Sequence, residues 1–353
     1  MKEDIIIRTA YPEDAERLSE IYKYYVENTA VSFECEAPSA EEFLARMNKI
    51  RRFYPYFAAE KDGRITGYAY AHAYNERAAY IRCAELTIYL DRDFRGQGLG
   101  RKLYEVLEDA LGSMGILDLY ALVAYPPQED EYLSENSFRF HESLGFTKAG
   151  HLRSAGFKFG RWYDMTIMGK QIGEHVPDAS EVLPYPESAL KFRRADEGDI
   201  DSVLEMLRSA RRRLDAQNIH MWDDSYPNRT VLEDDVAAGN LFVGELCGAV
   251  AVCYVINDWC DGDYALGKWQ YTGTRYRFGH RLCVDPRLQG LGLANVTMKH
   301  VEEQLRADGV ESFRFEAFAD NAVSLSLYEK HGYKTVGEVH WDAGVFYLME
   351  KLL

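Results

Sequence analysis

The stretch Ala84–Arg101, AELTIYLDRDFRGQGLGR, decides the fold of the first half of the chain. Its opening residues alternate, with Leu86, Ile88 and Leu90 on one face, and this alternation predicts a half-buried strand. A glycine-rich turn follows, and the apolar spacing that begins at Leu99 predicts an amphipathic helix. Glycines at a strand-to-helix turn let backbone N–H groups point at an anion, with the helix dipole behind them. We therefore expect this turn to bind a pyrophosphate.

The second half of the chain repeats the first. Tyr89–Leu111, YLDRDFRGQGLGRKLYEVLEDAL, matches Cys283–Leu305, CVDPRLQGLGLANVTMKHVEEQL. Ser137–Phe146, SFRFHESLGF, matches Ser324–Tyr333, SLSLYEKHGY. The copies stand about 190 residues apart, which is too long for a solenoid unit and typical of a duplicated domain. We expect domains at residues 1–172 and 190–353.

Each half is predicted to mix strands and helices. In the first half, the periodicities predict strands at 5–9, 55–60, 65–73, 80–90, 118–124, 146–153 and 162–169, and helices at 13–28, 39–50, 98–113 and 136–144. The second half repeats this order, so the fold class is α/β (α+β). Residues 173–189 carry Pro177, Pro184 and Pro186 without any periodicity, and they are predicted to form a semi-extended linker.

Composition excludes several classes of protein. The net charge of −16 argues against nucleic acid as a partner, because phosphate binding needs a basic face. No run of apolar residues reaches the roughly 18 of a membrane span, and the N-terminal residues do not resemble a signal peptide, so we expect a cytoplasmic protein that does not bind membranes. The six cysteines follow no metal-ligand or disulfide spacing, so no metal site is expected.

The spacing of the glycines narrows the choice of pyrophosphate. A Rossmann loop fails because the residue three after Gly98 is Arg101, and a P-loop fails because no Gly-Lys-Ser/Thr follows. The spacing [Q/R]-x-x-G-x-[G/A] fits, as Arg95-x-x-Gly98-x-Gly100 and again as Gln289-x-x-Gly292-x-Ala294. This pattern resembles the coenzyme A loop of the GNAT acetyltransferase superfamily.

The resemblance implies two tandem GNAT folds, each a mixed, mostly antiparallel sheet flanked by helices, with acetyl-CoA bound at each loop. It assigns coenzyme contacts to the end of the strand, the loop and one later asparagine. These residues are Ile88, Tyr89, Leu90, Arg95, Gly96, Gln97, Gly98, Leu99, Gly100, Arg101, Leu282, Cys283, Val284, Gln289, Gly290, Leu291, Gly292, Leu293, Ala294 and Asn321.

The first half resembles the phosphinothricin and related amino-acid N-acetyltransferases. The matching segments include IYKYYVENTAVSFECEAPS, AELTIYLDRDFRGQGLG, FHESLGF and GFKFGRWYD. The resemblance implies that Glu85 is the base that deprotonates an amine and that His141 stands near the thioester. It also implies that Phe33, Arg77 and Tyr80 frame a small amine acceptor, with an amino acid or its analogue favoured. One departure is the longer acidic segment AYPPQEDEYLSENS, residues 124–137, which is expected to form a lid.

Other interpretations of these first-half residues stay open. Glu85 faces away from Leu86, Ile88 and Leu90, so it could belong to a solvated strand face. His141, beside Phe140, could be a packed histidine.

The second half resembles a broader GNAT group, through GHRLCVDP, QGLGLA and DNAVSLSLYEKHGY. The resemblance implies that Tyr328 protonates the departing thiolate. Gly279 stands where the first half has Glu85, so the base differs or is absent. The alternative is that this half no longer catalyses and serves as a coenzyme A-binding regulatory or structural module. The sequence also allows a homodimer or an intramolecular pseudo-dimer of the two domains.

The duplicated glycine pattern predicts two acetyl-CoA sites per chain. Titration calorimetry should therefore give a stoichiometry of two, and a bulky side chain at Gly98 or at Gly292 should remove one site each, because each glycine leaves room for the phosphates. A single site in the unmodified protein would contradict the prediction.

Overall fold

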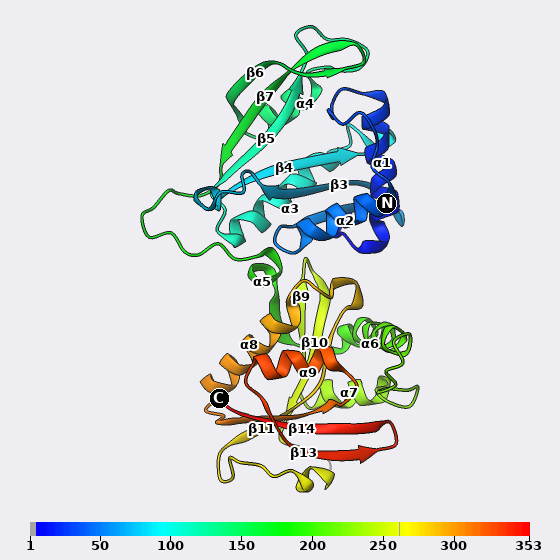
Figure 1. Cartoon of the computed structure of the whole chain (residues 1–353), viewed down its shortest axis with the longest axis vertical. Coiled ribbons are helices and arrows are strands. Elements are labelled where there is room, and N and C mark those ends of the chain that lie inside the picture. The colour runs from blue at the N-terminus through cyan, green and yellow to red at the C-terminus, as the bar shows by residue number, and fades with distance from the viewer. Residues whose placement is uncertain (1–4, 261) are drawn as a thin grey trace. The chain divides into compact units, whose positions relative to one another are not determined.

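The computed structural model describes residues 5–260 and 262–353, and the chain divides into two compact units. Unit 1 runs to Ala189 and unit 2 begins at Leu190, and each is built on one seven-stranded sheet flanked by helices (Figure 1). The predicted fold class, two tandem domains of α/β (α+β) type, is confirmed.

Unit 1 consists of β1 (Ile6–Thr9), α1 (Ala15–Asn28), α2 (Ala40–Arg51), β2 (Tyr56–Lys61), β3 (Arg64–Ala73), β4 (Cys83–Leu90), α3 (Leu99–Met114), β5 (Asp118–Tyr125), α4 (Asn136–Ser143), β6 (Thr147–Lys158), β7 (Arg161–Gln171) and α5 (Tyr185–Ala189). Unit 2 consists of β8 (Lys191–Arg194), α6 (Ile200–Asp215), α7 (Arg229–Ala237), β9 (Leu241–Leu246), β10 (Ala249–Asn257), β11 (Tyr276–Val284), α8 (Leu293–Ala307), β12 (Ser312–Phe318), α9 (Ala322–Lys330), β13 (Lys334–Trp341) and β14 (Gly344–Leu352).

The two sheets have the same topology. The strand order is β1-β2-β3-β4-β5-β7-β6 in unit 1 and, read from the equivalent edge, β8-β9-β10-β11-β12-β14-β13 in unit 2. Neighbouring strands are antiparallel except for one central pair in each sheet, β4 with β5 and β11 with β12. The mostly antiparallel mixed sheet that the resemblance implied is therefore present in both units.

The parallel strands separate part-way along their length. In unit 1 the described register ends at Glu85 and Tyr120, although β4 continues to Leu90 and β5 to Tyr125. Each strand keeps its antiparallel partner on the outer side. The inner edges of β4 and β5 therefore face each other across a gap in the middle of the sheet.

Alternation along β2 and β3 divides the core of unit 1 between two faces. Tyr56, Ala58 and Tyr68 pack in one cluster with residues of α1 and α2. Phe57 and Ala69, which are equally buried, point to the opposite face, where α3 contacts β2 and β3. The tyrosines of the first face stack on one another, with Tyr56 and Tyr68 rings 5.9 Å apart.

Two predicted strands have different limits in the structure. The strand expected at 80–90 begins only at Cys83, because Ala78–Tyr80 form a 3-10 turn that places Tyr80 outside the sheet. The strand expected at 146–153 extends to Lys158 through an irregularity between Leu152 and Gly156, which the alternation alone does not reveal.

The predicted linker packs against unit 1. Arg82 donates hydrogen bonds to the carbonyl oxygens of Ala179 and Ser180, at 3.0 and 2.6 Å. The Tyr185 ring is buried against Phe57 at a centroid distance of 5.6 Å. Residues 179–189 thus contribute to the core and surface of unit 1.

The same ion-pair clamp fastens the first strand of each unit. In unit 2, Arg193 of β8 holds Asp199 with two hydrogen bonds, of 2.6 and 2.7 Å, and reaches Glu245 of β9. Asp199 also accepts the N–H of Asp196 at 2.8 Å. Arg8, Asp14 and Glu60 form the equivalent clamp in unit 1.

We predict that Asp199→Asn destabilises unit 2 by about 1 kcal/mol, less than a fully buried charged hydrogen bond is worth, because the Arg193 side chain is 38% exposed. Bonding to Arg193 lowers the pKa of Asp199. The stabilisation should therefore be complete above the unfolded-state pKa of about 3.9 and disappear as the pH falls below it. Denaturant unfolding from pH 7 to pH 3 tests this, with Glu197→Gln, an exposed residue of the same turn, as the control. Equal unfolding midpoints for the two variants at pH 7 would contradict the prediction.

Candidate functional site

The glycine loops, residues 95–100 and 289–294, have the backbone geometry of an anion site. Gly98 and Gly292 precede α3 and α8 with φ of 78° and 84°, a left-handed conformation that other residues adopt at a cost. Neither glycine has a side chain to cap the first turn of its helix, and no atom lies within 4 Å of where a Cβ would stand. The first-turn N–H groups of α3 and α8 thus have no side-chain cap from these glycines, and a ligand can approach the turn closely.

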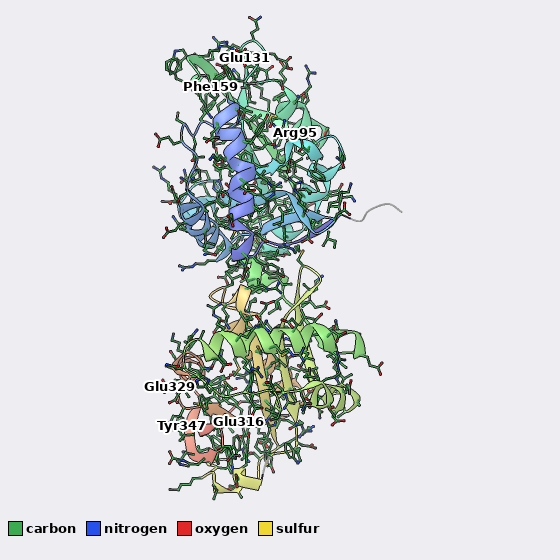
Figure 2. All side chains as sticks on the ribbon, turned by 90° about the vertical axis from the view of Figure 1, so that its right-hand side faces the viewer. Arg95, Glu131, Phe159, Glu316, Glu329 and Tyr347 are labelled. Carbon is green, nitrogen blue, oxygen red and sulfur yellow. The ribbon has the colours of Figure 1, made fainter. Side chains whose placement is uncertain are left out.

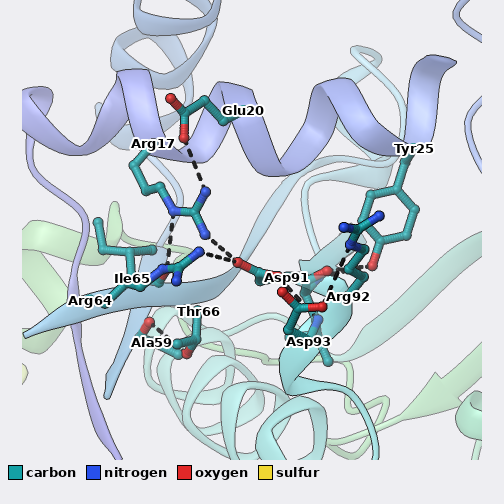
Figure 3. Close-up of polar contacts among 11 residues, drawn as sticks. Arg17, Glu20, Tyr25, Ala59, Arg64, Ile65, Thr66, Asp91, Arg92 and Asp93 are labelled. Atoms are coloured by element: carbon teal, nitrogen blue, oxygen red, sulfur yellow. Dashed lines mark hydrogen bonds and ion pairs between the residues drawn. The ribbon is translucent and has the colours of Figure 1, made fainter. Parts of the chain in front are cut away.

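A carboxylate fixes the point where the first glycine loop begins. Figure 3 shows Arg17 of α1 and Arg64 of β3 converging on Asp91, at the end of β4, with the Arg64 bond at 3.2 Å. Asp91 also accepts the N–H of Asp93 at 3.1 Å. In unit 2 the buried Asp285 stands at the same place and pairs with Arg287. The loop thus leaves the sheet from a fixed position in both units.

A tyrosine occupies part of the gap in unit 1. The Tyr25 hydroxyl donates to the carbonyl oxygen of Leu90 at 2.6 Å and accepts its N–H at 3.2 Å. The Arg95 guanidinium lies over the Tyr25 ring at 4.9 Å, and Figure 2 marks Arg95 in this unit. Ala210 stands in unit 2 where unit 1 has Tyr25, since both follow the clamp aspartate at the same distance in sequence.

The other predicted coenzyme residues of unit 1 lie on the same strand and turn. Ile88 is half-buried, and its backbone groups face the same strand edge as those of Leu90, because alternate residues point the same way. The Tyr89 side chain points into the core, against Tyr22 at 4.8 Å. Arg101 instead donates to the carbonyl oxygen of Ser143 at 3.0 Å, which ties α3 to α4.

Glu85 lies at the inner end of the gap. Its side chain is 18% exposed, and its carboxylate is 3.6 Å from Nε2 of His72 on β3. Burial raises the pKa of Glu85, and the neighbouring His72 partly opposes that rise. The carboxylate is therefore enclosed, unlike one on a solvated strand face, and it is a stronger base than a free glutamate.

Two of the three predicted acceptor residues lie in the loop before β4. Tyr80 is 39% exposed and lies near Tyr74, whose ring packs at a tilt on Tyr120, the cross-strand partner of Glu85. Arg77 is exposed and precedes the turn that carries Tyr80. A row of three tyrosine rings thus runs from Tyr80 to the strand position opposite Glu85.

Phe33, the third predicted acceptor residue, lies in the α1–α2 loop and packs against β6. Its ring covers Gly156, where an added Cβ would be 2.4 Å away. The expected lid, residues 124–137, is fastened beside it to the β6–β7 hairpin. Arg161 binds Asp130 and Glu131, each at 2.9 Å, and Tyr132 stacks on Phe159 at 4.2 Å (Figure 2).

His141 is placed in the core and does not face the gap. It is 3% exposed, with Nε2 bonded to the Tyr104 hydroxyl at 3.0 Å and Nδ1 to the carbonyl oxygen of Ser137 at 2.7 Å. Burial lowers the pKa of His141. Its predicted position beside the thioester stays a prediction, and this geometry favours a packed histidine, because both ring nitrogens are already engaged.

Unit 2 contains a large open cleft of about 2310 Å³. Ligand pockets for one drug-sized molecule measure about 300–1,000 Å³, so the cleft has room for two substrates. It brings together most of the residues predicted for this unit: Leu282, Cys283, Val284, Gln289, Gly290, Gly292, Leu293, Ala294, Asn321 and Tyr328. Leu291 lies on the loop between the lining residues.

Asn321 and Tyr328 contribute to this cleft from α9. The Asn321 side-chain oxygen caps the helix by accepting the Ser324 N–H at 3.1 Å, so its amide nitrogen is the group available to a ligand. The Tyr328 ring packs on Phe315 at 4.5 Å, and its hydroxyl has no hydrogen-bond partner among the described residues. Burial raises the pKa of Tyr328, which keeps the hydroxyl protonated.

Sequence reasoning missed a carboxylate in the same cleft. Glu316 of β12, labelled in Figure 2, lines it. Its carboxylate contacts His280 and Tyr264. The available signal was an acidic residue within FEAF, the otherwise apolar end of β12. Elsewhere in the described ranges, no helix has the length and apolar character to cross a membrane, and His, Cys, Asp and Glu form no cluster that could bind a metal.

Comparison with known proteins gives matches in both units. A family model described as an acetyltransferase (GNAT) domain matches residues 7–167, and one described as the acetyltransferase (GNAT) family matches residues 205–333. Phosphinothricin N-acetyltransferase of Streptomyces viridochromogenes is 32% identical over 45% of this chain and 83% of its own length. The L-methionine sulfoximine/L-methionine sulfone acetyltransferase of Salmonella typhimurium is 33% identical over 49% of this chain and 98% of its own length. A solved structure of a phosphinothricin acetyltransferase from Sinorhizobium meliloti, in complex with acetyl-CoA, is 30% identical. The match covers 51% of this chain and 98% of that one, with a TM-score of 0.46.

The Tyr25 contact gives a prediction about ligand affinity. Tyr25→Phe frees both backbone groups of Leu90 while keeping the ring in the core, and a hydrogen bond is worth about 0.5–1.5 kcal/mol net. Acetyl-CoA should therefore bind unit 1 roughly 2- to 10-fold more tightly by calorimetry. Tyr24→Phe, on the adjacent residue, is the control and should change nothing. Weaker binding by Tyr25→Phe would show that the hydroxyl contacts the ligand instead of competing with it.

Proposed function

Because the chain belongs to the GNAT acetyltransferase family and is one of its N-acetyltransferases, we propose that unit 1 acetylates the primary amine of an amino acid or amino-acid analogue. Acetyl-CoA is the donor, and the amine attacks it directly while both are bound. The position of Glu85 carries the proposal. An enclosed carboxylate stands where β4 and β5 separate, and the first glycine loop follows the same strand.

The donor would occupy the gap between the strands. The N–H groups of the first glycine loop suit its pyrophosphate, and the inner edge of β4 at Ile88 suits its amide-bearing arm. Backbone N–H groups on that edge would also stabilise the oxyanion that forms at the thioester carbonyl. Binding both substrates in one gap turns a bimolecular encounter into an oriented one.

Glu85 would remove the proton that prevents attack. An amine with a pKa near 10 is protonated at neutral pH and has no free electron pair. Burial raises the pKa of Glu85 and so increases its basicity, while His72, 3.6 Å away, is placed to share the proton. Activity should fall as the pH drops through the pKa of Glu85, because only the carboxylate form accepts a proton.

The loop before β4 supports an amino-acid acceptor. The exposed Arg77 guanidinium can bind a carboxylate with two parallel hydrogen bonds, and the rings of Tyr74 and Tyr80 can cover an apolar side chain. The relatives that act on phosphinothricin and methionine sulfoximine suggest the same class. The lid at residues 124–137 is the element that would alter the choice among such acceptors.

A second candidate concerns unit 2, which could bind coenzyme A as a regulatory or structural module. The observation that favours it is that β11 has Phe278 and Gly279 around the point where β4 has the carboxylate of Glu85, while the glycine loop at Gly292 is kept. Binding of acetyl-CoA by unit 2 without any turnover would support this candidate.

We predict that Glu85→Gln lowers kcat with L-methionine sulfoximine by a factor of about 10²–10⁴, the usual contribution of a general base. Acetyl-CoA affinity should be nearly unchanged, because the carboxylate lies away from the glycine loop. Thiol release measures the rate, and the exposed Glu76→Gln, which removes the same charge in the β3–β4 loop, is the matched control. Equal rates for the two variants at pH 7 would exclude Glu85 as the base.

A further inference from the structure

In unit 1 the acidic side chain at the opening of the strands is Glu85 of β4. In unit 2 it is Glu316, which comes from β12 and not from β11, the strand equivalent to β4. The parallel register of β11 and β12 ends at Gly279 and Phe315, and the next residues along the two strands are His280 and Glu316. His280 Nδ1 and Glu316 Oε2 are 3.4 Å apart. At the same distance along the chain from its glycine loop, 24 residues after Gly98 as Glu316 is after Gly292, unit 1 has Leu122, which is 43% exposed. The carboxylate therefore reaches the opening of the strands from β12.

Packing explains why β11 itself has no carboxylate here. A Cβ added to Gly279 would lie 2.5 Å from the Phe313 ring, which fills the space next to the strand. Phe313 is buried and packs on Phe315 at 5.7 Å, so the ring cannot move away easily. A glutamate at position 279 does not fit, and Glu316, which alternation places on the opposite face of β12 from Phe313, is the acidic side chain of the strand pair that lines the cleft.

Glu316 is held and partly enclosed. Its side chain is 18% exposed, and the Tyr264 hydroxyl donates a hydrogen bond to it. Tyr264 is buried under Phe278 and Trp269, so this bond fixes the carboxylate at the wall of the cleft. Tyr328 lies on the other side, close enough to feel the charge of Glu316.

His280 faces Glu316 with a lone pair. Its Nε2 contacts the Asn257 side-chain oxygen at 3.2 Å and the Trp259 carbonyl oxygen at 3.4 Å. The Asn257 oxygen is identified as an acceptor because it also receives the Trp259 N–H. Nε2 therefore carries the proton, and burial together with Arg281 lowers the pKa of His280 to about 4, so the ring is neutral at pH 7. Two acceptors, Nδ1 and the Glu316 carboxylate, then face each other with room for one proton between them.

We propose that unit 2 is a second acetyl-transfer site in which Glu316 is the general base and His280 shares the proton it takes up. This inference rests on the proposed acetyl-CoA chemistry and extends it to the second cleft. Glu316 takes one proton from the ammonium group, and the freed nitrogen forms a bond to the acetyl carbon as the carbon–sulfur bond breaks. Tyr328 protonates the thiolate, and the second amine proton returns to Tyr328 through water. Glu316 then releases its proton to solvent.

The walls near Glu316 indicate the class of acceptor. Trp259, Trp341 and Tyr226 line the cleft, and ammonium groups are attracted to aromatic faces. Arg281, next to His280 on β11, is paired with Asp235 and lies over the Tyr226 ring. The site therefore suits a primary amine on an aromatic or apolar body without an acidic group, in contrast to the amino-acid class proposed for unit 1.

The test uses the full chain in the Glu85→Gln background, with phenethylamine and cadaverine as acceptors and acetyl-CoA as donor. Glu316→Gln should lower thiol release at pH 7 by a factor of about 10²–10⁴. Glu316→Asp should restore part of the rate. Glu329→Gln on the exposed face of α9 removes the same charge from the same unit and should have no effect. Calorimetry that still counts two acetyl-CoA sites shows that each variant is folded.

The pH profile separates a base from a structural carboxylate. His280, Arg281, Asp235, Tyr226, Tyr264 and Tyr328 surround Glu316 and are unchanged in the variant. Without the base only free amine reacts, so the Glu316→Gln rate should rise roughly tenfold per pH unit up to the pKa of the acceptor. The parent should level off earlier.

Two results would overturn the inference. One is equal rates for Glu316→Gln and Glu329→Gln, and the other is no turnover of either amine while the second acetyl-CoA site is filled. Failure of the unit 1 proposal is a separate outcome, since it appears as unaltered acetylation of methionine sulfoximine when Glu85 is replaced in an otherwise unmodified chain.

Discussion

Each unit depends on a pair of strand edges that face each other without pairing. The parallel strands of the central pair are held on their outer sides by antiparallel partners, so they cannot close on each other after they separate. Backbone N–H and C=O groups inside a protein need partners. In unit 1, Tyr25 satisfies those of Leu90. The unpaired backbone groups along the gap thus need a hydrogen-bonding ligand or side chain. At the outer end of the gap, the N–H groups of the glycine loop complement a negatively charged group.

The residues that sequence could identify are those whose signals are local. The glycine loops were found because a turn, its dipole and the spacing of its glycines lie within a few residues. The role of Glu85 is a prediction from the resemblance to the phosphinothricin and amino-acid N-acetyltransferases, since the strand pattern alone also allows a solvated face. Glu316 was missed because its relation to Gly279 exists only across two strands, joined by the register of a parallel pair. The enclosure of His141 depends on Tyr104, from another helix, and was equally invisible.

Other differences between prediction and structure have the same origin. The segment before Leu190 reads as an extended spacer because its prolines interrupt any period, yet Tyr185 and Val182 find apolar partners on unit 1. The strand expected from residue 80 starts later because Ala78–Tyr80 turn before it. Packing against residues distant in the sequence determines the structure of both segments. The periodicity of apolar residues within a segment does not contain this information.

The contact between Gly279 and Phe313 couples the packing of two neighbouring strands. A side chain at position 279 would collide with the ring, while removing the ring alone would leave a cavity beside β11. A larger residue on β11 therefore fits only together with a smaller one on β12, and the two positions should behave non-additively when both are changed.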